Sequence, residues 1–431
     1  MKKYGEYTST DVTWLYEIPA HWKLYRAKRV FSNPKEKNEC NKENNVLSLT
    51  LKGVINNDID NPIGLSPSDY STYQIFEAND LVFKLIDLEN ISTSRVGLVH
   101  ERGIMSSAYI RFQAREDVNI RYFYLYYYSM WLRHIFNGLG AGVRQTLSAS
   151  DLLDIKIPVP PRPEQDQIVR FLDYKTAKID KLISGYKRQI ELLEERKRKV
   201  EDNAIVNGIN SDIAFKETKA EWMGKVPEHW REMRTKNFFA EINIRSENGD
   251  EPHLTMSQKY GLVTDDEYTQ KRLLSEDYKG AKLCWKDDIV LNRLKAHLGV
   301  FALSPILGVV SPDYTVIRIN QQYIIPEYAL KLFRCQSFRS ELTTRVRGIV
   351  EGFWRLYTED LGAIRVCIPS VEEQKQILQY VKEKETKINQ AIIGINKQIT
   401  LLQEYRTRLI SDVVTGQVDV RDETIPEIEV N

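Results

Sequence analysis

The stretch IPVPPRPEQDQI occupies residues 157–168, and a similar stretch, VCIPSVEEQKQI, occupies residues 366–377, a shift of 209. Each stretch leads from an apolar, proline-containing run into a long charged run. Pro163 suits the first turn of a helix, and Ser370 followed by Glu373 has the spacing of a capping box. The two stretches therefore predict two long helices that begin in the same way.

The sequence upstream of each stretch also recurs, at a shift of 208. The repeated residues are Trp14, Pro19, His21, Trp22, Arg26, Lys28 and Phe31, which recur as Trp222, Pro227, His229, Trp230, Arg234, Lys236 and Phe239. Further along, Asp80-Leu81-Val82 recurs as Asp288-Ile289-Val290. Solenoid repeats have periods of roughly 20–50 residues. This much longer period predicts a duplicated domain.

Both predicted helices carry apolar residues at every seventh position. In the first helix these are Ile179, Tyr186, Leu193 and Val200, with Leu182, Ile183, Gln189 and Ile190 at intermediate positions. In the second they are Ile388, Ile395, Leu402 and Leu409, with Ala391, Ile392, Gln398 and Ile399 between them. Such heptads, flanked by charged residues, predict that the helices form a coiled coil with each other. The alternative is two amphipathic helices that pack on separate globular cores.

Glycines mark the ends and the middle of both helices. Gly208 and Gly416 are placed to end them in left-handed geometry. Gly185 and Gly394 lie at equivalent interior positions, where a glycine costs up to about 1 kcal/mol relative to alanine. They indicate either a close helix crossing or a tolerated glycine on the solvent face.

The predicted fold class is α+β, with two similar mixed globular domains separated by two long helices that form a pseudo-two-fold symmetric coiled coil. Short β-rich runs such as DLVF, RVGLV and AYIRF in the first copy, and DIVL, GVFAL and YTVIRI in the second, lie between turn residues. Helical stretches follow near 120–136 and 327–345. The predicted parts are a first domain at 1–162, a first helix at 163–207, a linker at 208–220, a second domain at 221–369, a second helix at 370–416 and an acidic tail at 417–431. The linker and the tail are expected to be loosely structured.

Composition narrows the class of protein. The net charge is +1, from 61 basic and 60 acidic residues, and this total argues weakly against a nucleic-acid binder. The location of the charges matters more than their sum. The four cysteines form no C-x-x-C pair, which argues against a zinc site or a disulfide framework and fits a reducing compartment. The sequence has neither a secretory signal nor an apolar run long enough to span a membrane. We expect a cytoplasmic protein.

Known catalytic motifs are missing from the sequence. The only Gly-Lys pair, Gly224-Lys225, lacks the pattern of an ATP-binding loop, and the glycines of 138–142 suit a flexible loop better than a dinucleotide site. No Asn-Pro-Pro-Tyr or Asp-Pro-Pro-Tyr run, as adenine methyltransferases require, is present. Glu373-Gln374-Lys375 imitates a metal-nuclease pattern, but its duplicate lacks the lysine and helix capping explains the glutamate. The histidines form no metal-binding group. We predict no catalytic residue, cofactor or metal in this chain.

Basic residues gather in the same region of both copies. Residues 118–148 hold Arg121, Arg133 and Arg144 and no acid, and residues 328–358 hold six basic residues against two acids. Arginine binds phosphates or guanine edges, and glutamine can pair with adenine. The resulting DNA-binding candidates are Arg133, Arg144, Gln145, Arg345, Arg347 and Arg355. The many aromatic residues of 118–148, such as Tyr122 and Trp131, are more often core residues than stacking platforms.

A basic run lies on the first predicted helix. Arg196, Lys197, Arg198 and Lys199 follow Glu195. Such a run is usually a solvated helix face. The alternative is a docking surface for a partner protein or a phosphate contact.

With these motifs, the chain resembles a specificity subunit of a type I restriction–modification system over nearly its whole length. The strongest marks are the two stretches before the helices and the duplication. The runs KLIDLENISTSRVGLVHERGIMSSAYI (84–110) and NRLKAHLGVFALSPILGVVSPDYTVI (292–317) resemble target-recognition domain sequences of that family. They add Lys84, Arg95, Arg293 and Lys295 to the DNA-binding candidates. Arg144-Gln145 has no counterpart beside Arg355, so the two domains are expected to recognise different bases.

The resemblance implies that the two long helices form an antiparallel pair that holds the two domains apart. It also implies a function without chemistry in this chain. Each domain would recognise one half of a bipartite, asymmetric site in double-stranded DNA. The helices would dock two methyltransferase subunits, and translocase–endonuclease subunits would join them. S-adenosylmethionine, ATP and Mg would then bind to partner subunits. Two alternatives remain, a DNA-independent coiled-coil scaffold and a self-contained restriction–modification enzyme with a divergent active site.

Overall fold

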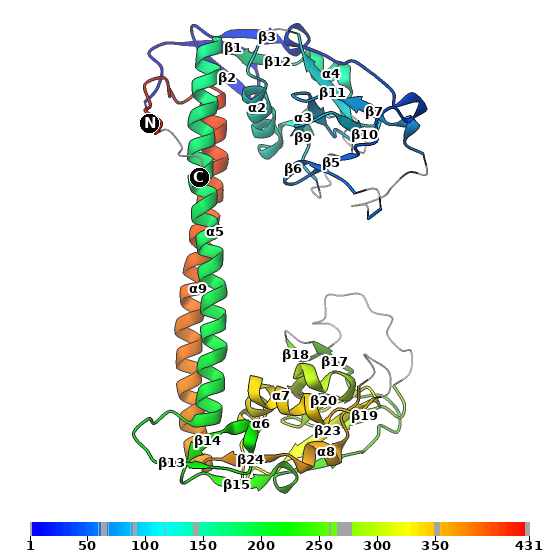
Figure 1. Ribbon diagram of the computed structural model, residues 1–431, viewed down its shortest axis with the longest axis vertical. Helices are drawn as coiled ribbons and strands as arrows, with labels where there is room; N and C mark the ends of the chain where they lie inside the picture. Colours follow the sequence, from blue (N-terminus) through cyan, green and yellow to red (C-terminus); the bar gives the residue numbers. More distant parts are fainter. Residues whose placement is uncertain are drawn as a thin grey trace. The chain divides into compact units, whose positions relative to one another are not determined.

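The computed structural model describes residues 2–58, 60–61, 67, 69–86, 88, 93–115, 117–140, 146–257, 260–264, 278–348 and 354–426. The chain forms two compact units. Unit 1 comprises residues 1–186 and 396–431, and unit 2 comprises residues 187–395. Both units are β-rich and repeat nearly the same order of strands and helices (Figure 1). The predicted α+β class and the duplication are confirmed.

Unit 1 is built around a four-stranded antiparallel sheet with the strand order β4-β11-β8-β9. The predicted strand runs DLVF, RVGLV and AYIRF form β8, β9 and β11. Smaller two-stranded sheets surround it, namely β1-β2, β3-β12, β5-β6 and β7-β10. The strands are β1 (Tyr7–Val12), β2 (Leu15–Pro19), β3 (Lys23–Arg26), β4 (Phe31–Ser32), β5 (Leu47–Thr50), β6 (Gly53–Asn56), β7 (Gln74–Phe76), β8 (Leu81–Phe83), β9 (Val96–Leu98), β10 (Gly103–Met105), β11 (Ile110–Ala114) and β12 (Lys156–Val159).

Helices accompany this sheet in unit 1. They are α1 (Ala27–Val30), α2 (Ile120–Leu132), α3 (Ile135–Leu139) and α4 (Ala149–Asp154), with the short turns η1 (Glu39–Asn41) and η2 (Tyr70–Thr72). Of these, α2 packs against strand β9 of the sheet. Tyr127 of α2 stands edge-on to Phe83 of β8, with ring centroids 5.0 Å apart. Tyr122 and Tyr126 are also buried. Most aromatic residues of this segment therefore belong to the core, as expected.

Unit 2 repeats the arrangement with the sheet order β16-β23-β20-β21. Its predicted runs DIVL, GVFAL and YTVIRI form β20, β21 and β23. The strands are β13 (Phe215–Glu217), β14 (Lys225–Pro227), β15 (Arg231–Arg234), β16 (Phe239–Ile242), β17 (Leu254–Ser257), β18 (Gly261–Thr264), β19 (Lys282–Cys284), β20 (Ile289–Asn292), β21 (Phe301–Leu303), β22 (Gly308–Val310), β23 (Tyr314–Ile319) and β24 (Arg365–Ile368). The helices and turns are η3 (Glu221–Met223), η4 (Thr235–Asn237), η6 (Arg293–Leu298), α6 (Pro326–Arg334), α7 (Gln336–Arg345) and α8 (Thr358–Ala363).

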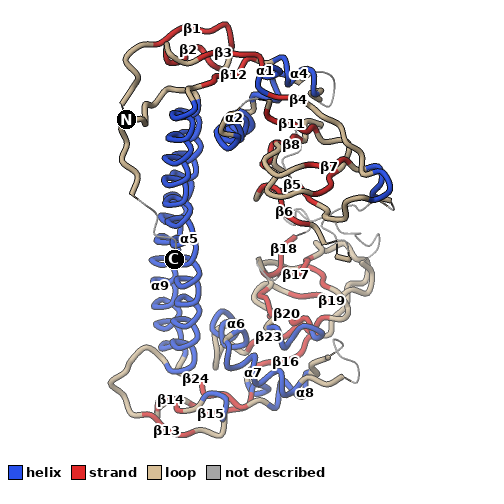
Figure 2. The backbone as a smooth tube through the Cα atoms, turned by 45° about the horizontal axis from the view of Figure 1, so that its top comes forward, coloured by secondary structure: helices blue, strands red, loops and turns tan. Residues whose placement is uncertain are grey.

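The two long helices, α5 (Arg162–Asn207) and α9 (Val371–Val414), pack together and run antiparallel (Figures 1 and 2). In unit 1, Asp180 of α5 pairs with Arg406 of α9 at 3.4 Å. In unit 2, Lys197 of α5 donates to Asn389 of α9 at 3.1 Å. Lys197 lies further along α5 than Asp180, but its partner on α9 has the lower number, so the helices run antiparallel. The heptads predicted that the helices pair, and the family resemblance implied their direction.

Some residues assigned to the helix seam lie outside it. Leu182 is exposed, as are Gln189, Ala391 and Gln398. A Cβ at Gly185 or Gly394 would have no neighbour within 4 Å, which favours the solvent-face interpretation over a close crossing of α5 and α9. Gly208 and Gly416 have φ of 79° and 75°, as their predicted place at the helix ends requires.

Three segments are more ordered than the sequence indicated. The linker 208–220 contains β13, which pairs with β14 as β1 pairs with β2. Residues 417–423 of the tail pack on unit 1, where Val420 is fully buried. Gly138 and Leu139, assigned to a flexible loop, belong to α3. In each case local polarity concealed partners that are distant in sequence.

Candidate nucleic-acid interface

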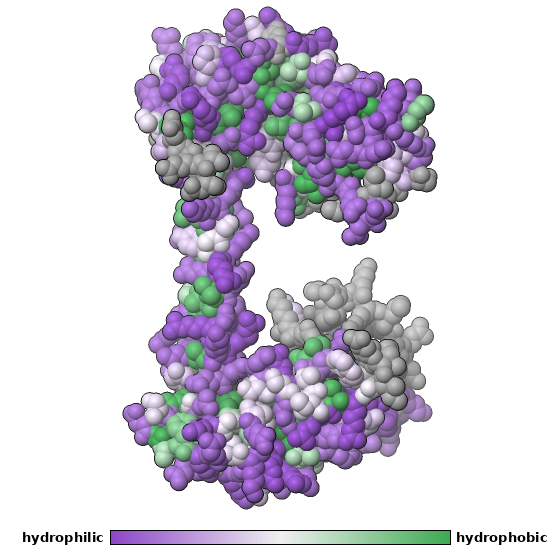
Figure 3. Space-filling model, in the orientation of Figure 1, coloured by the Kyte–Doolittle hydropathy of each residue, from purple (hydrophilic) through white to green (hydrophobic). Residues whose placement is uncertain are grey.

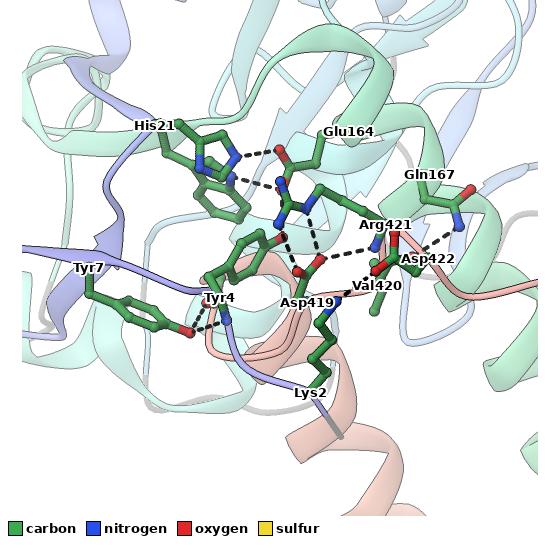
Figure 4. Close-up of polar contacts among 12 residues, drawn as sticks. Lys2, Tyr4, Tyr7, His21, Glu164, Gln167, Asp419, Val420, Arg421 and Asp422 are labelled. Atoms are coloured by element: carbon green, nitrogen blue, oxygen red, sulfur yellow. Dashed lines mark hydrogen bonds and ion pairs between the residues drawn. The ribbon is translucent and has the colours of Figure 1, made fainter.

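A glutamate at the start of α5 ties the β1-β2 hairpin of unit 1 to the helix. Glu164 accepts hydrogen bonds from the phenol of Tyr4, from His21 Nε2 at 2.8 Å and from the Trp22 indole N–H at 3.0 Å (Figure 4). Burial, and next the bond to Glu164, raise the pKa of Tyr4 far above its usual range, so the phenol keeps the proton that it donates. This buried carboxylate fixes the N-terminal hairpin against α5.

The C-terminal segment of unit 1 closes over the same place. The Asp419 N–H donates to the Lys2 carbonyl at 2.9 Å, and Asp422 pairs with the Lys2 ammonium at 2.7 Å. Arg421 binds Asp419 at 2.8 Å and lies over the Tyr4 ring (Figure 4). The hydrogen bond from Arg421 is the main reason why the pKa of Asp419 is lowered.

We call the bonds of the glutamate to the histidine and the tryptophan the latch. Unit 2 contains the same latch, without the contacts of the terminal segments. Glu373 accepts from His229 at 2.8 Å and from Trp230 at 3.1 Å. The Glu373 N–H donates to the Ser370 hydroxyl at 3.3 Å, so half of the predicted capping box forms. The carboxylate, however, binds the distant histidine and tryptophan, which corrects the capping explanation of this glutamate. The recurrence of His-Trp and Glu-Gln at nearly the same shift was the available signal.

The glutamine after each glutamate holds the entry to the next helix. Gln165 donates to the Pro160 carbonyl and accepts the Asn119 N–H, both at 2.8 Å. Gln374 likewise donates to the Pro369 carbonyl at 3.0 Å and accepts the Ile325 N–H at 2.8 Å. These bonds place α2 and α6 against the long helices in the same way in both units.

Several basic residues of the segments 118–148 and 328–358 bind side chains of the long helices. Arg121 makes a bidentate contact with Asp173 of α5, the shortest distance being 2.7 Å. Lys331 lies between Glu201 and Glu385, at 2.8 and 3.1 Å. Arg133, a DNA-binding candidate, points its guanidinium toward Ser411 of α9 and the Trp14 carbonyl, each at 3.4 Å. Part of the local basic excess is therefore structural.

The other candidates of unit 1 are less accessible than the sequence indicated. Arg95 is only 1% exposed and approaches the backbone carbonyls of Lys84 and Ile86, so its side chain is not at the surface. Lys84 itself is partly buried. Arg144 and Gln145 lie outside the residues that the structure describes.

In unit 2 the candidates meet at one corner. The backbones of Arg347 and Arg355 exchange hydrogen bonds of 2.8 and 3.0 Å, and the Leu356 N–H donates to the Arg293 carbonyl at 3.1 Å. Lys295 is exposed on η6, which begins at Arg293. Trp354 stands edge-on to His297 of the same turn, with centroids 5.2 Å apart. This corner brings Arg293, Lys295, Arg347 and Arg355 together.

Intramolecular contacts restrict two arginines of unit 2. Arg347 pairs with Asp360, and Arg293 donates to the Asp313 carbonyl at 2.8 Å. Arg345, a candidate outside this corner, pairs with Glu341 along α7 at 2.6 Å.

The backbone bond between Leu356 and Arg293 has an equivalent in unit 1, where the Leu147 N–H donates to the Leu85 carbonyl. This equivalence aligns Leu356 with Leu147, and therefore Arg355 with Thr146. Arg355 and Arg144 are therefore not equivalent positions.

A groove in unit 1 contains polar residues that, apart from Arg121, the sequence did not single out. Its volume is about 700 Å³, and it lies between the β5-β6 hairpin, β9 and α2. Its lining includes Lys52, Asn56, His100, Arg121 and Tyr124 and no carboxylate. Such a mixture of cations and amides suits a polyanion with hydrogen-bonding edges.

The basic run on α5 borders a second groove. Arg196 and Lys199 line a groove of about 460 Å³ in unit 2, together with Leu192, Val200 and Tyr380. Lys199 also pairs with Glu195 at 2.6 Å, while Lys197 binds Glu194 and α9 and Arg198 is exposed. Only Arg196 and Lys199 of the run thus contribute to a concave surface.

Within the described part of the chain, no group of three or more His, Cys, Asp or Glu side chains is placed to hold a metal ion. None of the described helices has the length and apolarity to cross a membrane.

Comparisons with known proteins agree with this geometry. The family model for the type I restriction modification DNA specificity domain matches residues 19–192. The type I restriction enzyme MjaVIII specificity subunit of Methanocaldococcus jannaschii is 24% identical, over 75% of this chain and 76% of its own length. The putative MjaX specificity subunit of the same organism is 23% identical, over 64% of this chain and 63% of its own.

One solved chain, from a study of complex assembly and conformational transition of the type I restriction–modification system, superimposes with a TM-score of 0.59. It covers 94% of this chain and all of its own, at 14% identity. At this identity the likeness concerns the fold.

Proposed function

The chain belongs to the family of type I restriction–modification specificity subunits, a generally non-catalytic family, and we propose that it recognises a bipartite, asymmetric site in double-stranded DNA. The observation that carries this proposal is that the two units share the bonds of a glutamate to a histidine and a tryptophan but expose different residues. Glu164 accepts from His21 and Trp22, and Glu373 accepts from His229 and Trp230. The corner of Arg293 and Arg355 in unit 2 has the Leu85–Thr146 corner as its counterpart in unit 1. Similar scaffolds with different surfaces suit two different half-sites.

We assign target recognition to the segments 1–162 and 221–369, and subunit assembly to the helices at 163–207 and 370–416. Residues 208–220 and 417–431 connect and close these parts. Two methyltransferase subunits would dock on the helices, and translocase–endonuclease subunits would join them. The groove beside Arg196 and Lys199 supports a docking role for that helix face. S-adenosylmethionine, ATP and Mg would bind to these partners, and the cytoplasm would be the place of action.

The two alternatives make different predictions. A DNA-independent scaffold would show no salt-dependent DNA binding even with a methyltransferase present. A self-contained enzyme would methylate or cleave DNA as the purified chain alone. The proposed specificity subunit would do neither reaction alone, but it would direct a partner's methylation to one sequence.

The direct experiment is methylome sequencing of cells with and without this gene in the presence of its methyltransferase. We expect one bipartite methylated motif to disappear when the gene is removed. Transfer of a radiolabelled methyl group to DNA by the chain alone, free of partner subunits, would contradict the proposal. So would an unchanged methylome.

A further inference from the structure

Each unit contains a two-stranded hairpin whose tip carries an exposed, large apolar side chain. In unit 1 the hairpin β5-β6 turns through Leu51 and Lys52, before Gly53 begins β6, and Leu51 is 58% exposed. In unit 2 the hairpin β17-β18 has Tyr260 before Gly261, and Tyr260 is 66% exposed. Both glycines have positive φ, 100° and 76°, which a tight turn requires and which other residues rarely adopt. The two hairpins thus occupy equivalent places in their units, while Leu51 lies in a two-residue turn and Tyr260 is the described residue of a longer connection.

The base of each hairpin is packed on the central sheet. Leu47 and Leu49 of β5 are buried, and a Cβ at Gly97 of β9 would lie 2.6 Å from Leu49 Cδ1 and 2.7 Å from Val54 Cγ2. In unit 2 the corresponding strand, β21, has the small residue Ala302 opposite Val290, as Gly97 lies opposite Val82. Small residues therefore let each hairpin lie flat on the edge of its sheet. Such a base holds the tip in a fixed direction.

The surroundings of the β5-β6 tip favour a nucleic acid. The 700 Å³ groove beside it is lined by Lys52, Asn56 and His100 and by Arg121, whose guanidinium binds Asp173 of α5, and no carboxylate is among its lining residues. Glu101 lies next to this set and binds Asn56 at 2.5 Å and His100 at 3.2 Å, which fixes both side chains. Lys52 makes no ion pair with any described residue. Figure 3 shows hydrophobic residues among hydrophilic ones on the visible face of unit 1, and Leu51 adds an exposed apolar side chain next to Lys52 of this groove.

We propose that these two hairpins are the ribbons with which the chain contacts bases of its DNA target, Leu51 and Lys52 in one half-site and Tyr260 in the other. This rests on the proposed function. A two-stranded ribbon fits the major groove of B-DNA, which is about 12 Å wide. An apolar side chain there contacts the methyl group of thymine, and a lysine binds a guanine edge or a phosphate. Different tips on equivalent ribbons give the two half-sites different sequences.

The test uses the full chain assembled with its methyltransferase subunits. The variants Leu51→Ala, Lys52→Ala and Tyr260→Ala are compared with the control variant Lys23→Ala. Lys23 is an exposed lysine on β3 of unit 1. Binding to target and scrambled duplexes is measured at several salt concentrations, and the methylome is sequenced for each variant. All four positions are exposed, so assembly should be preserved.

We expect Leu51→Ala to reduce discrimination at one base pair of one half-site by roughly ten-fold, and Tyr260→Ala to do so only in the other half-site. If Lys52 binds a base, Lys52→Ala should lower discrimination in the first half-site. If Lys52 binds a phosphate, the variant should instead lower the slope of log affinity against log salt concentration by about one. Lys23→Ala should behave like wild type. If the wild-type complex is specific and the three hairpin variants are unchanged, the hairpin inference fails while the proposed function stands. If the wild-type complex shows no sequence preference, both fail.

Discussion

The Trp22 indole N–H donates to the carboxylate of Glu164 at 3.0 Å, across 142 residues of sequence. The same bond joins Trp230 to Glu373 at 3.1 Å in unit 2. In each unit a β-hairpin is thereby attached to the first turn of a long helix. The position of the recognition fold relative to its own helix segment depends on this contact.

We expect Glu164→Ala to lower the free energy of unfolding by about 1–3 kcal/mol, because the buried indole and phenol donors would lose their acceptor. Calorimetry of the purified chain measures the change. Glu191→Ala on the exposed face of α5 is the control, since Glu191 pairs with Arg188 at a solvent-exposed site. It should change stability by less than about 0.5 kcal/mol. Equal effects of the two variants would contradict the latch.

Acid should weaken the closure of unit 1 by its C-terminal segment. The pKa of Asp419 is lowered, chiefly by its hydrogen bond from Arg421, so its ionised form stabilises the folded state. This stabilisation is complete above the unfolded pKa of about 3.9 and is lost as the pH falls through the lower folded value. Asp419→Asn should cost on the order of 1 kcal/mol at neutral pH and flatten the acid dependence. Unfolding measured between pH 2 and 7 tests this, and parallel curves for both proteins would refute it.

Two glycines on the long helices should respond in opposite directions to alanine. Gly416 has φ of 75°, and a Cβ there would lie 2.7 Å from Pro19 Cγ and 3.1 Å from Trp22 Cη2. Gly416→Ala should therefore destabilise the chain by more than the roughly 1–2 kcal/mol of the left-handed backbone alone. Gly185→Ala meets open space in a helix interior and should stabilise it by up to about 1 kcal/mol. Thermal unfolding of both variants measures these changes in stability. A loss of stability in Gly185→Ala would show that this position is crowded.

Arg355→Ala should weaken DNA binding by the partner complex and leave assembly intact, because Arg355 lies at the basic corner with Arg293 and Arg347. A bidentate base contact contributes about 1–3 kcal/mol of discrimination, whereas a phosphate contact affects all sequences. Arg144→Ala carries the same expectation for unit 1. Binding to target and non-target duplexes separates the two roles. Wild-type affinity and discrimination in both variants would place the recognition surface elsewhere.

Periodicity and repetition predicted the architecture because both can be read directly from the spacing of residues along the sequence. The heptads of α5 and α9, the left-handed Gly208 and Gly416 and the six strand runs were all found where expected. What failed depended on contacts between distant residues. The tail around Asp419 looked loose because its partner, Lys2, lies at the other end of the chain.

The candidate site was predicted less well for a related reason. A basic residue in the sequence does not reveal whether its partner is DNA or another side chain. Arg121 and Lys331 turned out to bind carboxylates of the long helices, and Arg95 is buried. Exposure at a hairpin tip, as for Leu51 and Tyr260, has no sequence signal at all.

The division of unit 1 between the two ends of the chain orders events during synthesis. Unit 2 draws only on residues 187–395, whereas unit 1 needs residues 396–431 in addition to its N-terminal part. A growing polypeptide can therefore complete unit 2 while the first 186 residues still wait for their last helix segment and for Asp419. A chain interrupted before residue 396 would leave Tyr122 without the Val414 carbonyl that it binds at 2.9 Å. Synthesis therefore completes unit 1 after unit 2. When the chain stops before residue 396, unit 1 stays open, and we expect it to be exposed to proteolysis.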